Sequence, residues 1–329
     1  MRRRSPPEPR TGWTLLELLA VVAILGLLTA TILPAVQQAR EASRRADCSN
    51  RMRQIGLALH AFEQSKRTFP ANCTGIGRDE RGLYSTHVAL LPYLELTALR
   101  NQMEEQPATL DLMIESWNTA PAWTRQEYSA LMCPSAAGPW GTNYTYCTGS
   151  MTTISFARDE RSGAFSSYVP RRAGEFRDGM SHTAALSEHL VAPAAPSDFD
   201  IRVHYWFSGA SSMMSSADIE TALPSICQSG GHLTAPKDDT VGWQWYLGSY
   251  GRTWYNHTET PNSTRIDCSA ASPAPPRSTQ GMHPPRSRHP QGVNVLAMDG
   301  SVHFVSDSID HGVWKAMATI AGSEVTESW

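Results

Sequence analysis

The sequence predicts an α+β protein in which one long N-terminal helix, first transmembrane and then amphipathic, packs on the antiparallel β-sheet of a globular head. Two observations predict this class: an apolar run close to the N-terminus, and short β-type runs that alternate with turns over residues 68–329. Of the 329 residues, 41% are hydrophobic and 18% are charged, which excludes a disordered chain and a protein with many membrane spans.

The apolar run covers Trp13–Leu33, and Glu17 is its one charged residue. A helix of this length measures about 30 Å, which is enough to cross the hydrocarbon core of a bilayer. The apolar region of a secretory signal peptide is shorter, about 7–15 residues, and ends in small residues. The run therefore indicates a membrane-spanning helix over residues 13–33.

The helical pattern continues beyond the apolar run. Alanines and then larger apolar residues recur at three- and four-residue steps between positions 35 and 62, as on one face of an amphipathic helix. We therefore assign residues 13–66 to a single N-terminal helix and residues 67–329 to the head. Pro34 lies where the two halves of the helix meet, and a helix kink or local unwinding is expected there.

The formal net charge of −3 is unevenly distributed. It divides into +3 on residues 1–12, −1 at Glu17, +4 on residues 35–67 and −9 on residues 68–329. The overall balance argues against a nucleic-acid partner, and the basic N-terminus matches the positive-inside tendency of membrane proteins. An acidic head beside a basic helix segment suggests that neighbouring copies meet through opposite charges.

Glu17 is unusual for a simple membrane anchor. A carboxylate inside an apolar helix costs about a few kcal/mol in lipid unless it finds a partner. The amine of a newly cleaved N-terminus on a neighbouring copy would be a suitable partner.

The start of the apolar run, together with the short basic leader before it, carries a recognisable motif. It consists of Gly12-Trp13-Thr14-Leu15-Leu16-Glu17-Leu18-Leu19. This resembles the prepilin motif G-F-T-L-I-E-L of type IV pilins and type II secretion pseudopilins, with Trp in place of the usual Phe. The resemblance implies that residues 1–12 are a leader, that a prepilin peptidase cuts between Gly12 and Trp13 and methylates the new N-terminus, and that Glu17 serves assembly.

Within the head, β-type runs bounded by turn residues predict several strands. They cover residues 143–147, 164–169, 183–187, 203–207, 293–298 and 301–305. A helix is expected from about Tyr93 to Glu104. Asp299-Gly300 predicts a type I′ hairpin turn between the last two strands, and Asp307 or Ser308 is expected to cap a short helix after them.

A second motif lies at this hairpin: His289, nine further residues, and then Asp299-Gly300. It resembles the H-x9-D-G element of a large bacterial pilin-like family whose members also carry the prepilin motif. The similarity covers residues 12–190 and 287–322, which leaves about 193–285 as a variable insert. We interpret Asp299 and Gly300 as turn residues and expect His289 to form a hydrogen bond across the hairpin base.

Six cysteines in a chain that is expected to be exported suggest disulfides, although sequence alone leaves fifteen possible pairings. The resemblance suggests Cys48 with Cys133, which would tie the long helix to the head. Cys227 with Cys268 would close the insert. The chain has no C-x-x-C pair, so a zinc ribbon is not expected.

We expect no enzyme activity, because the G-x-S-x-G, H-E-x-x-H, Walker A and G-x-G-x-x-G patterns are all absent from the sequence. We also expect no cofactor and no metal. Asp299, Asp307 and Asp310 are weak candidates for a Ca²⁺ site, since they supply hard oxygen ligands but lack EF-hand spacing.

The resemblance therefore implies a pilin-like or pseudopilin-like structural subunit. Its expected partners are prepilin peptidase and copies of itself or other pilin-like subunits in a filament. It would sit in the inner membrane as a single-pass protein with a periplasmic or extracellular head, and could end in an extracellular filament. The alternative is a membrane-tethered binding module whose aromatic-rich insert binds glycan or protein. We favour the interpretation that the aromatic side chains of this insert lie in the core.

Overall fold

The structure is a computed structural model of the 329-residue chain. It describes residues 15–76, 79–105, 121–136, 138–154, 161–165, 169–193, 200, 202–207, 216–228, 237–238, 241–270 and 280–322. Gly12 and Trp13, the expected processing residues, lie outside this set. Internal contacts divide the chain into an N-terminal unit, Met1–Arg44, and a head unit, Arg45–Trp329.

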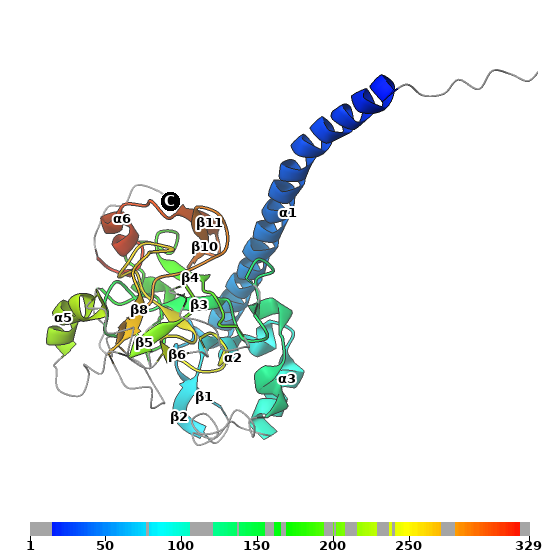
Figure 1. Ribbon diagram of the computed structural model, residues 1–329. Coiled ribbons are helices and arrows are strands. Elements are labelled where there is room, and N and C mark those ends of the chain that lie inside the picture. Colours follow the sequence, from blue (N-terminus) through cyan, green and yellow to red (C-terminus); the bar gives the residue numbers. More distant parts are fainter. Residues whose placement is uncertain are drawn as a thin grey trace, which may run out of the picture. The chain divides into compact units, whose positions relative to one another are not determined.

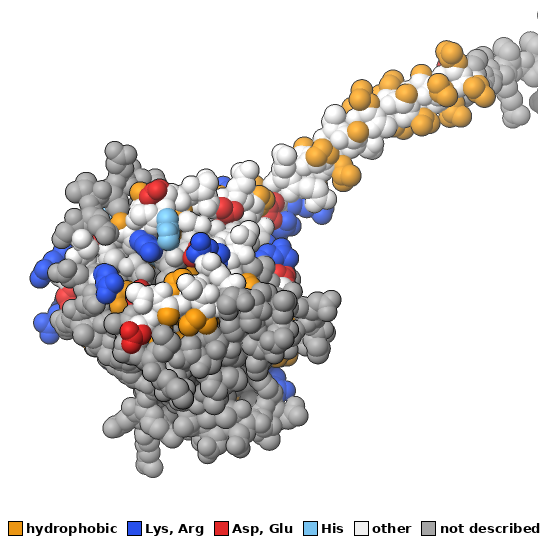
Figure 2. Space-filling model, turned by 60° about the vertical axis from the view of Figure 1, so that its left-hand side comes forward, with side chains coloured by type: hydrophobic (Ala, Val, Ile, Leu, Met, Phe, Trp, Pro, Cys, Tyr) orange, Lys and Arg blue, Asp and Glu red, His pale blue; other side chains and the backbone are white. Residues whose placement is uncertain are grey.

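The predicted long helix is confirmed as α1, Leu15–Lys66, and Pro34 lies inside it without ending it. The part of α1 in the N-terminal unit exposes its leucines, isoleucines and valines. Figure 2 shows these hydrophobic side chains along the helix. In the described residues α1 is the one helix long and apolar enough to cross a membrane.

The part of α1 that belongs to the head unit buries one face. Met52, Ile55 and Leu59 lie on this face and are at most 2% exposed, at the three- and four-residue spacing of a helix. Gly56 lies between them, and a Cβ atom there would come within 3.1 Å of the Leu296 side chain. The glycine therefore allows α1 to approach the sheet closely.

The sheet at the centre of the head has five strands in the order β11-β10-β4-β3-β7. Figure 1 labels four of them, β11, β10, β4 and β3. The strands are β3 (Tyr144–Cys147), β4 (Ala184–Glu188), β7 (Trp254–Tyr255), β10 (Gly292–Ala297) and β11 (Val302–Ser306). The pairs are antiparallel except β3 with β7, which is parallel. The sheet is thus mixed rather than wholly antiparallel, because a long connection returns the chain to the free edge of β3.

The other elements lie around this sheet. The strands are β1 (Thr74–Ile76), β2 (Asp79–Tyr84), β5 (Tyr205–Phe207), β6 (Lys237–Asp238), β8 (Asp267–Ser269) and β9 (Gly281–Met282). The α-helices are α2 (Thr86–Leu90), α3 (Thr97–Glu105), α5 (Ser216–Gln228) and α6 (His311–Ala316). The 3-10 helices are η1 (Leu91–Tyr93), η2 (Ala122–Arg125), η3 (Ser129–Leu131) and η4 (Ala173–Glu175). Strands β1 and β2 form a small sheet of their own, and β6-β5-β8-β9 form a third.

Five of the predicted strands are confirmed as β3, β4, β5, β10 and β11. Residues 164 and 165 form no strand, and 166–168 lie outside the described residues. The helix expected from Tyr93 begins later, at Thr97, because Glu95 adopts a positive φ of 61° and interrupts it. Likewise α6 is capped by Asp310, whose carboxylate accepts from two backbone N–H groups, and not by Asp307 or Ser308.

The predicted hairpin is confirmed, but its turn differs from the expected type. Strands β10 and β11 pair from Leu296 with Val302, which leaves Asp299 and Gly300 in a longer loop. Gly300 has a φ of +92°, whereas Asp299 is not among the residues with positive φ. A type I′ turn requires positive φ at both central residues, so that expectation was wrong. The Asp299 carboxylate instead accepts hydrogen bonds from Ser301 N and Oγ, at 2.9 and 2.7 Å.

The described aromatic side chains of the 193–285 segment lie mainly in the core. Trp245, Tyr246, Tyr250, Trp254 and Tyr255 are each at most 1% exposed. Trp243, Trp245 and Tyr246 lie in turns rather than in a strand. The interpretation of these five residues as core is confirmed, and β7 shows that the segment contributes to the central sheet.

A buried histidine lies beneath this sheet. His87 Nε2 donates to the Tyr144 carbonyl oxygen at 2.9 Å, and Nδ1 accepts from the Tyr146 hydroxyl at the same distance. These partners suit the neutral ring, which has one donor and one acceptor nitrogen. Burial lowers the pKa of His87 to about 4, since desolvation disfavours the charged form.

Two further histidines are buried in the same way. Burial lowers the pKa of His257 to about 3, although its ring lies against the Trp314 carbonyl oxygen. Burial also lowers the pKa of His189 to about 3, and the charges of Arg286 and Arg252 lower it further. All three histidines are therefore neutral in the folded head at pH 7.

We predict that the head loses stability as pH falls from about 6.5 towards 4. His87 then binds a proton in the unfolded chain but stays neutral in the folded head. This difference lowers the free energy of unfolding by on the order of 3 kcal/mol for this residue alone. His87→Gln keeps a donor but cannot titrate, so it should flatten the dependence of unfolding free energy on pH. Denaturant titrations of both proteins at several pH values measure this difference. Equal slopes for the two proteins would contradict the assignment.

Candidate functional site

The first candidate site is the N-terminal part of α1. Glu17 lies near the N-terminal end of the described part of α1. Its neighbours Leu15, Leu16, Leu18 and Leu19 are between 59% and 82% exposed. So much exposed apolar surface indicates contact with lipid or with other helices.

The second candidate site is a buried group that we call the junction cluster: Cys48, Cys133, Glu188 and His289. Cys48 belongs to α1, Cys133 precedes β3, Glu188 ends β4, and His289 precedes β10. The four side chains are at most 4% exposed, and their sulfur, oxygen and nitrogen donor atoms lie within 4.8 Å of one another. Four distant parts of the chain thus meet where α1 joins the head.

The cluster contains one of two disulfides. Cys48 is bonded to Cys133 across 85 positions, and Cys227 is bonded to Cys268 across 41. Both expected pairings are confirmed. Cys147 is in neither bond, and burial raises the pKa of its thiol to about 12, which makes it a poor nucleophile.

Glu188 is held by three hydrogen-bond donors. Its Oε1 lies 3.1 Å from His289 Nε2 and 3.0 Å from Asn294 Nδ2, and its Oε2 accepts from Asn294 N at 2.8 Å. Strands β4 and β10 are neighbours in the sheet, which places Asn294 beside Glu188. Such donors offset the cost of burying a carboxylate.

His289 was expected to form a hydrogen bond across the base of the β10–β11 hairpin. Its Nε2 lies 3.1 Å from Glu188 Oε1 on β4, the strand beside β10. Its Nε2 also lies 3.7 Å from Cys133 Sγ. Sequence analysis missed Glu188, for which the one local signal is a carboxylate at the end of an apolar strand.

The Ca²⁺ candidates each have a separate local role. Asp299 caps the hairpin turn, Asp310 caps α6, and Asp307 accepts from Asn262 Nδ2 at 2.7 Å. In the part of the chain that the structure describes, these three carboxylates form no group that could hold one ion.

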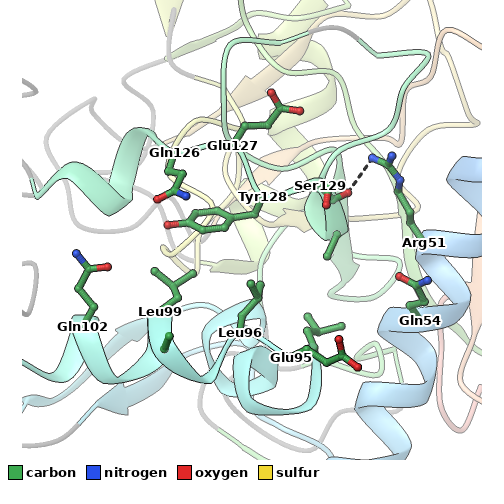
Figure 3. A pocket seen from close by; sticks show the side chains of 13 residues that line it. Arg51, Gln54, Glu95, Leu96, Leu99, Gln102, Gln126, Glu127, Tyr128 and Ser129 are labelled. Carbon is green, nitrogen blue, oxygen red and sulfur yellow. Dashed lines mark hydrogen bonds between the residues drawn. The ribbon is translucent and has the colours of Figure 1, made fainter.

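A groove of about 820 Å³ lies beside the junction. It is lined by α1, by residues 94–102 and by residues 126–130 (Figure 3). Arg51 on α1 extends towards residues 126–130 on the other side of the groove and donates to the Ser129 carbonyl oxygen at 2.8 Å. The exposed carboxylates of Glu95 and Glu127 lie in its lining, together with apolar side chains such as Leu96 and Leu99.

We predict that replacing both cysteines of the junction, Cys48→Ser/Cys133→Ser, lowers the free energy of unfolding by about 2–5 kcal/mol, because the unfolded chain loses a cross-link. The matched control is Cys227→Ser/Cys268→Ser, which opens a loop half as long and should cost about 0.6 kcal/mol less by chain entropy. Denaturant unfolding followed by tryptophan fluorescence gives both values. A junction variant as stable as the unchanged protein would refute the prediction.

Comparison with known proteins places these features in a family. A family model described as a protein of unknown function (DUF1559) matches residues 37–312, which include the junction cluster and the hairpin. No curated protein and no solved structure matches the chain. Because the matched region covers well over half of the sequence, the chain belongs to the DUF1559 family.

Proposed function

We propose that this protein is a pilin-like or pseudopilin-like structural subunit. A prepilin peptidase removes its leader, and the mature chain assembles with copies of itself or with other pilin-like subunits. The product is a filament of the type IV pilus or type II secretion kind. Membership of the DUF1559 family together with an apolar N-terminal helix is compatible with an exported pilin-like protein.

The observation that carries the proposal is the division of α1 into two chemically different parts. Its N-terminal part exposes large apolar side chains at consecutive positions, such as Leu15 with Leu16 and Leu27 with Leu28. Consecutive positions lie about 100° apart around a helix, so several sides are apolar. A helix of this kind suits lipid before assembly and the interior of a helix bundle afterwards.

The location of the head is inferred from its disulfides. Disulfides such as Cys48–Cys133 and Cys227–Cys268 persist mainly outside the reducing cytosol. This supports a single-pass protein of the inner membrane with a periplasmic or extracellular head. We propose no enzyme activity and no nucleic-acid partner.

Contacts between neighbouring subunits are proposed at two levels. In the helix bundle, Glu17 pairs with the N-terminal amine of a neighbouring copy, because a buried carboxylate needs a cation. Outside the bundle, the +4 charge of residues 35–67 faces acidic surfaces of neighbouring heads, and the groove with Glu95 and Glu127 is one such surface.

The alternative of a glycan-binding module has weaker support. A platform for sugar rings needs exposed aromatic faces, whereas Trp245 and Trp254 are at most 1% exposed and Trp243 is half-buried. The structural role is therefore preferred.

Processing is tested at the expected cleavage site. Gly12→Val should leave an uncleaved precursor, because a branched side chain replaces the glycine that the peptidase recognises. Gly26→Val, within the apolar helix, is the control and should be cleaved. Mass spectrometry of the N-terminus reports the result, and a Gly12→Val chain that still begins at Trp13 would refute processing at this site.

Assembly is tested at the helix carboxylate. Glu17→Ala should insert in the membrane yet be missing from sheared filaments, because the N-terminal amine of the neighbour loses its counter-charge. Glu63→Ala removes a carboxylate from the head end of the same helix and should assemble normally. Immunoblots of membrane and sheared fractions compare the two variants. Normal incorporation of Glu17→Ala would rule out the pairing.

A further inference from the structure

We propose that, once the Cys48–Cys133 disulfide is reduced, the junction cluster binds one Zn²⁺ ion through both thiolates, His289 Nε2 and a Glu188 carboxylate oxygen. The inference rests on the geometry of these four side chains and is independent of the proposed filament role.

The distances within the cluster match those of a tetrahedral zinc site. Zn–S bonds of about 2.3 Å and Zn–N or Zn–O bonds of about 2.0–2.2 Å place ligand atoms about 3.3–3.8 Å apart. Cys133 Sγ lies 3.7 Å from His289 Nε2 and 3.9 Å from Glu188 Oε1, and these last two atoms are 3.1 Å apart. Cys48 Sγ lies within 4.8 Å of the other donor atoms, and breaking the disulfide lets the two sulfur atoms separate to the spacing of metal ligands.

The surroundings of the cluster also suit a metal. Asn294 N donates to Glu188 Oε2 at 2.8 Å and would keep orienting the carboxylate while Oε1 turns to the ion. The Tyr144 hydroxyl donates to the Cys48 carbonyl oxygen at 3.2 Å, which steadies the helix beside that sulfur. Ligands on α1, β4 and the sheet-bound chain before β10 are held by rigid elements.

The net charge of the buried site is the same in both states. A disulfide is neutral, and Zn²⁺ with two thiolates is also neutral, so exchanging one for the other leaves the charge contributed by the remaining groups unchanged. Binding therefore adds no uncompensated charge to a cluster that is at most 4% exposed. By contrast, a bare pair of thiolates beside Glu188 would be strongly disfavoured.

The reaction balances with a phosphine as the reductant. Disulfide, phosphine and water give two thiols and a phosphine oxide, so the sulfur atoms gain two electrons and phosphorus loses them. Zn²⁺ then displaces one proton from each thiol. His289 coordinates as the neutral ring with its proton on Nδ1, which leaves Nε2 free to bind the ion.

Such a site would change how α1 is joined to the head. In the oxidised protein the joint is covalent, between Cys48 and Cys133. In the reduced protein the ion would link the same residues and would add β4 and the chain before β10 to the joint. The helix would then stay fixed to the sheet under reducing conditions.

The test uses the full chain in detergent micelles, reduced with a phosphine and titrated with Co²⁺ and then Zn²⁺. One Co²⁺ per chain should produce thiolate charge-transfer absorption and the intense visible bands of tetrahedral cobalt, and Zn²⁺ should abolish both. The oxidised protein should show neither signal. Absence of these bands in the reduced, folded protein would overturn the proposal.

Variants assign the ligands. Asn294→Ala, which removes an outer hydrogen bond, should weaken Co²⁺ binding about 10–100-fold. His289→Ala and Glu188→Gln remove direct ligands and should weaken it more than that, whereas His303→Ala on β11 should have no effect. Equal affinities for His289→Ala and His303→Ala would contradict the assignment.

A measurement on the unchanged chain covers the case in which a variant fails to fold. Zn²⁺ should slow alkylation of Cys48 and Cys133 in the reduced protein but leave Cys227 and Cys268 unprotected, which mass spectrometry of labelled peptides resolves. If reduction unfolds the head, Zn²⁺ should restore its circular dichroism spectrum. Uniform alkylation, or a head that Zn²⁺ does not restore, would overturn the proposal.

Discussion

The attachment of the C-terminal part of α1 to the central sheet is the constraint on which the head depends. Met52, Ile55 and Leu59 bury one face of the helix, and Gly56 lets the backbone come close to Leu296. The Cys48–Cys133 bond also links α1 covalently to the segment before β3.

The contacts at this joint also explain how the interior accommodates the carboxyl group of Glu188. Glu188 is almost fully buried, yet Asn294 and His289 supply its hydrogen bonds from the neighbouring strand and from the chain before it. A buried carboxylate with these partners favours one arrangement of β4 against β10, since any slip in register would leave it unpaired. The H-x9-D-G element thus has two separate roles, with His289 at the joint and Asp299-Gly300 at the turn.

The segment of residues 193–285 is part of the head's structure. Its strand β7 completes the central sheet, and Trp245 and Tyr246 pack edge-on against Trp123, which lies far from them in sequence. Aromatic side chains bury large apolar areas, so these contacts stabilise the head as a whole. An aromatic-rich segment can therefore be core even where its sequence lacks a regular strand pattern.

The sequence by itself determined the features that depend on local spacing. The long helix, five of the predicted strands and the position of the hairpin follow from periodicity and turn residues, and the resemblance supplied the Cys48–Cys133 pairing. Only the tertiary structure decided the parallel pairing of β7, the turn type at Asp299-Gly300 and the meeting of Glu188 with His289. The pairing of β7 and the contact of Glu188 with His289 depend on residues far apart in the chain, and the local sequence pattern at Glu188 or Trp254 contains no information about which distant strand will lie beside it.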